Sequence, residues 1–214
     1  MKLFEAMKPV KAMKPSEQLN FLTDLAKELG CYEVSKYVLE DNRFVQWSGS
    51  GDPNQHHYGY GGLMIHTAEV VELCFIMREH YEGVHVIDPV ELYLAALFHD
   101  AGKMFDYEYA ADEDVPDEPF WRSTEHKRLI HHISRSAIIW TEAQYSAAAR
   151  GHAISKEMRD NILHAILAHH TKREHGSPVA PKTRVAWLLT LCDNISARMD
   201  DADTWDIIKR PQTF

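Results

Sequence analysis

The chain has 214 residues and a net charge of −9, with 45% hydrophobic and 26% charged residues. This composition is typical of a folded globular protein and excludes a disordered, collagen-like or coiled-coil chain. No apolar run approaches the ~20 residues that cross a bilayer, so no membrane span is expected. The negative charge repels nucleic acid and anionic membranes at long range, so a polyanionic ligand has to be held by local groups, and no extended nucleic-acid surface is evident.

The N-terminus and the cysteines favour a cytoplasmic protein. The first ten residues mix charged and apolar side chains and lack the continuous apolar segment of a secretory signal. The three cysteines, Cys31, Cys74 and Cys192, are widely spaced and form no CxxC pair. Neither a disulfide framework nor a thiolate zinc site is therefore expected, and a reducing compartment fits best.

The N-terminal quarter of the chain predicts two helices and a loop. Pro15 opens a segment with leucines at helical spacing that ends at Gly30, and a short helix is predicted over 31–40. Residues 48–62 are rich in glycine and polar residues, which predicts a long loop that forms a wall of a site. We therefore expect 1–55 to be a helical extension and loop that packs on the core.

The remaining sequence predicts five further helices and no β-strand. Asp88 and Pro89 open one of these helices, which ends near Gly102, and the acidic stretch 106–118 reads as a solvated loop. The five predicted helices cover 62–81, 88–102, 125–149, 155–170 and 181–201. Residues 202–214 are expected to form a C-terminal tail. The fold class is therefore predicted to be all-α, a bundle of about six to eight helices in one compact domain.

Polar residues stand at core positions of several predicted helices. His66 lies within the apolar stripe of 62–81, and apolar stripes elsewhere end at His99 with Asp100, at His169 with His170, and at Asp193. A histidine on an apolar face can simply be a hydrogen-bonded core residue, and an aspartate near a helix end can be a cap. Converging imidazoles and carboxylates are, however, stabilised together by a divalent cation, so the whole set, with His132, predicts a metal site.

The order of these residues resembles the HD superfamily of metal-dependent phosphohydrolases, with His66, then HisAspAlaGlyLys at 99–103, then Asp193. The resemblance covers about 56–201 and implies an HD-domain helical bundle. The additional histidines are similar to those of binuclear members. By this similarity, one ion would be held by His66, His99, Asp100 and Asp193. Asp100 would bridge to a second ion held by His132, His169 and His170.

Within the superfamily, the chain looks most like the HD domain of the 3'-to-5' exoribonucleases of Gram-positive bacteria. The matching residues are His56, His57, Gly61, Gly62, Leu63 and His66 in one run, and His169, His170, Gly176, Ser177, Pro178, Pro181, Lys182, Thr183, Asp193, Asn194, Ala197 and Met199 in the other. Those enzymes carry an N-terminal OB-type nucleic-acid-binding domain. The first 65 residues here, predicted as two helices and a loop, leave no room for it.

The donor set indicates the metal and its chemistry. No thiolate stands at a ligand position, so Mn²⁺, Fe²⁺, Co²⁺, Ni²⁺ or Zn²⁺ is expected, and Mg²⁺ is less natural for a histidine-rich site. Two such ions would lower the pKa of a bridging water and generate hydroxide near neutral pH. Asp100 would then take part in catalysis as the bridging ligand.

Further polar residues near the motif are candidates for binding substrate or moving protons. Lys103 could neutralise charge on a phosphate, although a solvated lysine at a helix end is the alternative. His57 and His131 could act as acids for the leaving group, or they could be ordinary loop and surface histidines. The candidate nucleotide-binding residues are Lys172, Arg173 and Lys182, for which a solvated loop is the simpler interpretation.

Three classes of function are consistent with the sequence. The first is a phosphodiesterase, similar to a 3'-5' exonuclease, that hydrolyses short oligonucleotides with a metal-activated hydroxide. The second is a nucleotide phosphohydrolase, either a (d)NTPase or a 5'-nucleotidase, which the acidic charge favours. The third is a non-catalytic metal-binding HD module, although the complete ligand set and Lys103 argue against it. The sequence leaves the oligomeric state open.

Overall fold

The most apolar segment of the chain, α5 (Pro89–Phe98), forms the centre of the fold. The structure is a computed structural model that describes residues 8–110 and 120–209, and residues 92–98 within it are all buried. Asp88 starts the helix, because its side chain accepts hydrogen bonds from the amides of Val90 and Glu91. A helix that is apolar on every side has to be covered on every side, and other helices pack around α5.

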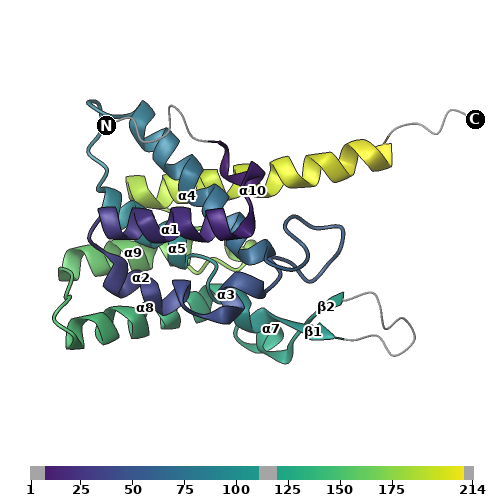
Figure 1. The fold of residues 1–214 in the computed structure, drawn as a ribbon, viewed down its shortest axis with the longest axis horizontal. Coiled ribbons are helices and arrows are strands. Elements are labelled where there is room, and N and C mark those ends of the chain that lie inside the picture. The colour runs from purple at the N-terminus through teal and green to yellow at the C-terminus, as the bar shows by residue number, and fades with distance from the viewer. Residues whose placement is uncertain (1–7, 111–119, 210–214) are drawn as a thin grey trace, which may run out of the picture.

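Four long helices pack around α5 (Figure 1). They are α4 (Gly62–His80), α8 (His132–Ala149), α9 (Lys156–Ala168) and α10 (Arg184–Lys209), and α10 packs on both α4 and α9. Two further helices cover this bundle: α1 (Pro15–Glu28) packs on α4, and α2 (Tyr32–Leu39) packs on α8. The other α-helices of the described residues are short, namely α3 (Asn42–Gln46), α6 (Lys103–Asp106) and α7 (Glu125–Leu129). Short 3-10 helices lie at Val10–Ala12 and Arg173–His175.

The all-α prediction is confirmed by this architecture. Seven of the α-helices in the described residues have eight residues or more, which agrees with the expected six to eight. None of the described helices is both long and apolar enough to cross a membrane. The three cysteines are free and buried, and Cys192 belongs to the core.

A small β-hairpin contradicts the prediction that no strand would form. Strands β1 (Tyr107–Ala110) and β2 (Phe120–Ser123) pair antiparallel, with Tyr107 opposite Ser123 and Tyr109 opposite Trp121. Each strand has four residues, which is too short for alternation to be recognised in the sequence. The hairpin therefore includes part of the stretch that was predicted as a loop over 106–118; residues 111–119 lie outside the described residues.

Three helix boundaries also differ from the predicted ones. The helix expected over 125–149 is broken between α7 and α8, because His131 has a positive φ of 68°. The helix expected to end near Gly102 stops at Phe98 instead, and a turn leads into α6. The last helix extends eight residues beyond its predicted end at 201. Breaks of this kind depend on contacts between distant segments, which helical periodicity does not contain.

Gly102 allows the turn after α5 to lie directly against α8. A Cβ on this residue would come within 2.2 Å of the carbonyl oxygen of His132. The amide of Gly102 also donates a hydrogen bond to Ser136 Oγ at 2.8 Å. The absence of a side chain therefore brings Asp100, two residues before the glycine, close to the start of α8.

Gly102→Ala is expected to lower the free energy of unfolding by about 1–3 kcal/mol, because the methyl group would push against backbone that cannot rotate away. Urea denaturation followed by circular dichroism measures the loss. Gly59→Ala is the control, since its methyl group would meet open space and only its positive φ is unfavourable. A loss at Gly102 no larger than that at Gly59 would contradict the close packing.

Candidate metal centre

Seven histidine and aspartate side chains converge from five segments of the chain. These segments are α4, the turn after α5, the start of α8, the end of α9, and α10. The candidate ligand atoms form two groups, within each of which all atoms lie within 4.8 Å of one another. The first group is His66, His99, Asp100 and Asp193, and the second is Asp100, His132, His169 and His170. The structure thus brings together all seven residues that the sequence predicted as ligands, and Asp100 belongs to both groups.

Each of the five histidines is oriented by a contact at Nδ1, which leaves Nε2 as the atom available to a ligand. The Nδ1 partners are Ser196 Oγ for His66 (3.1 Å), the Ala96 carbonyl for His99 (2.7 Å), Asp106 Oδ2 for His132 (3.2 Å), the Ile166 carbonyl for His169 (2.6 Å) and the His175 carbonyl for His170 (2.7 Å). Proteins orient metal-binding imidazoles in this way.

Three buried polar atoms of the centre have no hydrogen-bond partner among the described residues, and their positions indicate whether a metal ion fits these residues. Asp100 Oδ1, His132 Nε2 and His169 Nε2 are buried and accept or donate no hydrogen bond. Both imidazole nitrogens lie 3.5 Å from that carboxylate oxygen. Since an unpaired buried polar group is unfavourable, three such atoms around one point fit a divalent cation.

The first group is held together by coupled charges. His66 Nε2 lies 3.4 Å from Asp100 Oδ2 and 3.1 Å from Asp193 Oδ1. Burial opposes a charge on His66, but the hydrogen bonds to these two carboxylates raise its pKa to about 9. Burial likewise opposes the charge on Asp100, while Lys103, whose Nζ lies 2.8 Å from Oδ2, and His99 hold its pKa well below its usual range. A proton on His66 and the ammonium of Lys103 therefore balance the two carboxylates.

Three of the four other candidate histidines are suited to bind as neutral ligands, whereas the nearby Asp100 carboxylate raises the pKa of His169 although burial opposes its charge. Burial lowers the pKa of His99 to about 4, that of His132 to about 3 and that of His170 to about 4. Imidazole binds metals in its neutral form, so these three side chains need lose no proton near pH 7.

Asp106 is a residue of the centre that the sequence analysis missed. It was assigned to a solvated acidic loop, but its side chain is fully buried. Oδ2 accepts hydrogen bonds from the amide and Nδ1 of His132, and Oδ1 lies 3.0 Å from His126 Nδ1. In the sequence Asp106 resembles the acidic residues that follow it. The contacts that distinguish it come from residues 20 to 26 positions away.

Glu69 and Ser196 form a second orienting contact, behind His66. The Ser196 hydroxyl donates to Glu69 Oε2 at 2.9 Å and thus accepts from His66 Nδ1. His57 Nε2 lies 3.1 Å from the same Glu69 oxygen. Glu69 and Ser196 each follow a candidate ligand, His66 or Asp193, by three residues on a helix, and this spacing was a signal that could have identified them.

A cavity of about 340 Å³ opens onto the centre. Lys103 and His131 line it, and the loop 48–62 forms one wall through Gly49, Ser50, Gln55 and His56, as predicted. Among the described residues, His56 faces the cavity whereas His57 does not. His57 is buried against Glu69 instead, so a catalytic role for it is not favoured by its position.

The other predicted substrate-binding residues lie apart from this cavity. Arg173 and Lys182 line a separate pocket with His164 and Thr171, and Lys172 lines neither of the two. Among the described residues, the structure therefore does not bring these three side chains into the cavity of the metal centre.

Residues 63–198 match the HD domain family, which is a match to more than half of the chain. The chain belongs to the HD domain family. An HD domain indicates a metal-dependent hydrolase of phosphoric esters, and the two clusters of histidine and aspartate described above could hold the metal. The expected family resemblance is thereby confirmed.

Curated relatives of the chain include several bacterial nucleases. The chain is 27% identical over 170 residues to the 3'-5' exoribonuclease YhaM of Shouchella clausii, and 30% identical over 170 residues to YhaM of Bacillus subtilis. These alignments include 79% of this chain but only 48% and 49% of the relatives, so the chain spans about half the length of the curated relatives it matches. No solved structure matches the chain.

Metal affinity is expected to rise with pH. At pH 6 a proton occupies His66, whose pKa is about 9, and an ion bound to the first group has to displace it. The apparent affinity of that group for Mn²⁺ should therefore increase about tenfold per pH unit between pH 6 and 8.5 and level off above pH 9. Isothermal titration calorimetry in buffers of different ionisation enthalpy measures both the affinity and the released proton. An affinity independent of pH would contradict the arrangement.

Asp106→Asn is expected to weaken metal binding by about 10- to 100-fold, because His132 would lose the carboxylate that orients it. Titration of the metal-free protein with Co²⁺, followed by visible absorption, measures the change. Asp160→Asn is the matched control, since Asp160 lies exposed on α9 in a surface pair with Lys156. Equal affinities in the two variants would count against an orienting role for Asp106.

Proposed function

We propose that this protein is a phosphodiesterase that releases nucleotides from an end of short oligonucleotides. The observation that carries the proposal is the pair of four-residue clusters that share Asp100, with unpartnered atoms of Asp100, His132 and His169 facing one point. Two metal ions at a shared carboxylate are the arrangement used to cleave P–O bonds without a covalent enzyme intermediate. The similarity to 3'-5' exoribonucleases supports an oligonucleotide substrate.

Two divalent ions would be held by the residues of these clusters. His66, His99 and Asp193 would bind one ion, His132, His169 and His170 the other, and Asp100 both. Imidazole and carboxylate donors favour Mn²⁺, Fe²⁺, Co²⁺, Ni²⁺ or Zn²⁺ over Mg²⁺. When bound, the ions would supply a hydroxide near neutral pH and neutralise charge on the phosphate.

The residues around the cavity would bind and orient the substrate. Lys103 carries a permanent positive charge at the cavity wall, which would stabilise a non-bridging phosphate oxygen. His131 and His56 also line the cavity, and burial lowers the pKa of both, to about 3 for His56. Both rings are therefore uncharged near pH 7, and each would offer one N–H donor and one acceptor nitrogen to the substrate.

A nucleotide phosphohydrolase is the second candidate. A cavity of about 340 Å³ is at the small end of the range for ligand sites, roughly the size of one nucleotide. The net charge of −9 also disfavours long polyanions. A non-catalytic role is less favoured, because all seven candidate ligands and Lys103 are present. The free cysteines fit a reducing compartment such as the cytoplasm.

The test is a substrate panel with defined metal content. The protein is stripped of metal, reloaded with Mn²⁺, and incubated with (d)NTPs, nucleoside monophosphates, cyclic dinucleotides, short RNA and short DNA, with products separated by chromatography. Successive release of mononucleotides from oligomers is the expected result. Asp100→Asn should lower the rate by at least about a thousandfold, because both clusters lose their shared charge.

Asp160→Asn, the exposed control on α9, should retain full activity. Cleavage confined to free nucleotides would favour the second candidate. Stoichiometric metal binding with no turnover of any substrate, whichever metal is loaded, would favour the non-catalytic module.

A further inference from the structure

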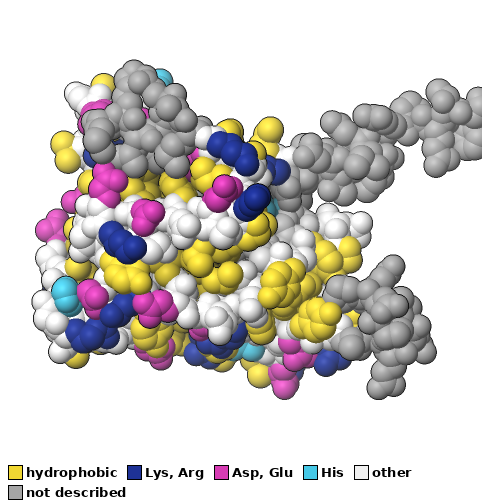
Figure 2. Space-filling view, in the orientation of Figure 1, with side chains coloured by type: hydrophobic (Ala, Val, Ile, Leu, Met, Phe, Trp, Pro, Cys, Tyr) yellow, Lys and Arg dark blue, Asp and Glu magenta, His cyan; other side chains and the backbone are white. Residues whose placement is uncertain are grey.

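The β-hairpin carries an aromatic surface whose role the metal centre does not explain. Successive side chains of a strand point to opposite faces, so Tyr107 and Tyr109 of β1 share one face with Trp121 of β2. The Tyr109 and Trp121 rings meet edge to face, with centroids 5.6 Å apart. We call Tyr109, Trp121 and Trp47, whose ring lies 5.4 Å from that of Trp121, the aromatic face. The space-filling view shows hydrophobic side chains gathered near the hairpin (Figure 2).

The aromatic face is continuous with the cavity of the metal centre. Tyr107, on the same face of β1, lines that cavity together with Lys127. Lys127 Nζ lies 4.6 Å above the centre of the Tyr107 ring and 3.2 Å from its hydroxyl oxygen. Tyr109 follows two residues later, about 6.8 Å along an extended strand. A chain that leaves the cavity beside Tyr107 therefore meets Tyr109 next.

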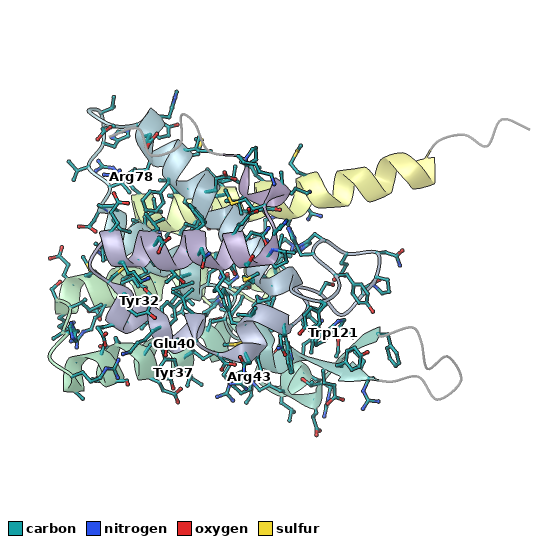
Figure 3. The ribbon with its side chains drawn as sticks, viewed as in Figure 1. Tyr32, Tyr37, Glu40, Arg43, Arg78 and Trp121 are labelled. Atoms are coloured by element: carbon teal, nitrogen blue, oxygen red, sulfur yellow. The ribbon has the colours of Figure 1, made fainter. Side chains whose placement is uncertain are left out.

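Hydrogen bonds hold the backbone of Trp121 and the ring of Trp47 in place. The backbone amide of Trp121 donates to the Tyr58 hydroxyl at 3.0 Å, and the Trp47 indole donates to the Tyr107 carbonyl at 2.8 Å. Trp121 is 4% exposed and lies on the hairpin (Figure 3). Tyr109, by contrast, is 55% exposed. A fixed aromatic base with one open ring can accept a flat ligand at little conformational cost.

We propose that the aromatic face binds a base of the single-stranded oligonucleotide, stacked on Tyr109, next to the nucleotide that is cleaved in the cavity. This inference rests on the proposed phosphodiesterase function. Every base has a π-face, so stacking on tyrosine or tryptophan is tolerant of sequence, and a nearby cation such as Lys127 follows the backbone. The surface would thus distinguish an oligonucleotide from a mononucleotide, which reaches only the cavity.

The test compares Tyr109→Ala, Tyr109→Phe and Tyr145→Ala in the Mn²⁺-loaded protein of 214 residues. Tyr145 is the matched control, because it is 61% exposed on α8 and lines neither of the pockets described above. Two substrates are used: an octaribonucleotide, and bis(p-nitrophenyl) phosphate, a small diester that occupies the cavity alone. Tyr109→Ala should raise KM for the octamer about 5- to 100-fold, the loss of one stacked base, and leave hydrolysis of the small diester unchanged. Tyr109→Phe should retain the wild-type KM.

Binding separates the inference from the proposed function. Anisotropy of a fluorescent, phosphorothioate-linked octaribonucleotide reports affinity without turnover, and weaker binding by Tyr109→Ala alone would support the aromatic face even if no diester is hydrolysed. Equal octamer binding and KM in Tyr109→Ala and Tyr145→Ala would overturn the inference. A parallel loss of small-diester hydrolysis, or equal losses in the Phe and Ala variants, would also overturn it, since stacking requires the ring and not the hydroxyl.

Discussion

The buried carboxylate of Asp100 is the group on which the rest of the centre depends. It lies between two histidine clusters, with Oδ2 near His66 and Lys103 and Oδ1 near His132 and His169. An ionised carboxylate at this depth is unfavourable unless positive charge surrounds it, and a divalent cation on each side would meet that requirement better than hydrogen bonds do. The five segments that supply the other candidate ligands are therefore constrained to meet at one point.

Other residues of the fold hold the candidate histidine ligands in position through contacts at Nδ1. Carbonyl groups at the ends of α5 and α9 fix His99 and His169, while Asp106 and the pair of Ser196 and Glu69 fix His132 and His66. Glu69 also contacts His57 in the loop that walls the cavity. The Glu69 carboxylate thus links the orientation of the candidate ligand His66 to the position of the loop that walls the cavity.

Much of the centre could be predicted because its residues break an otherwise regular pattern. His66 within an apolar stripe, and His99 and Asp100 at the end of another, are visible in the sequence as polar groups where a core is expected. Asp106 could not be recognised in the same way, since it stands at the edge of an acidic stretch, and only burial against α8 distinguishes it from its neighbours. The break at His131 was missed for a similar reason, because the contact of His132 with Asp106 at the start of α8 joins residues 26 positions apart.

The sequence by itself determined the helical fold, the family and the residues with the chemistry to bind metal, because periodicity and residue type are local properties. Only the tertiary structure decided which of these residues share one cavity. It brought His56 and Tyr107 to the cavity wall and left His57, Lys172, Arg173 and Lys182 elsewhere. The physical reason is that a few close approaches between distant segments, such as that of Gly102 to His132, fix where each side chain lies, and such contacts leave no periodic signal in the chain.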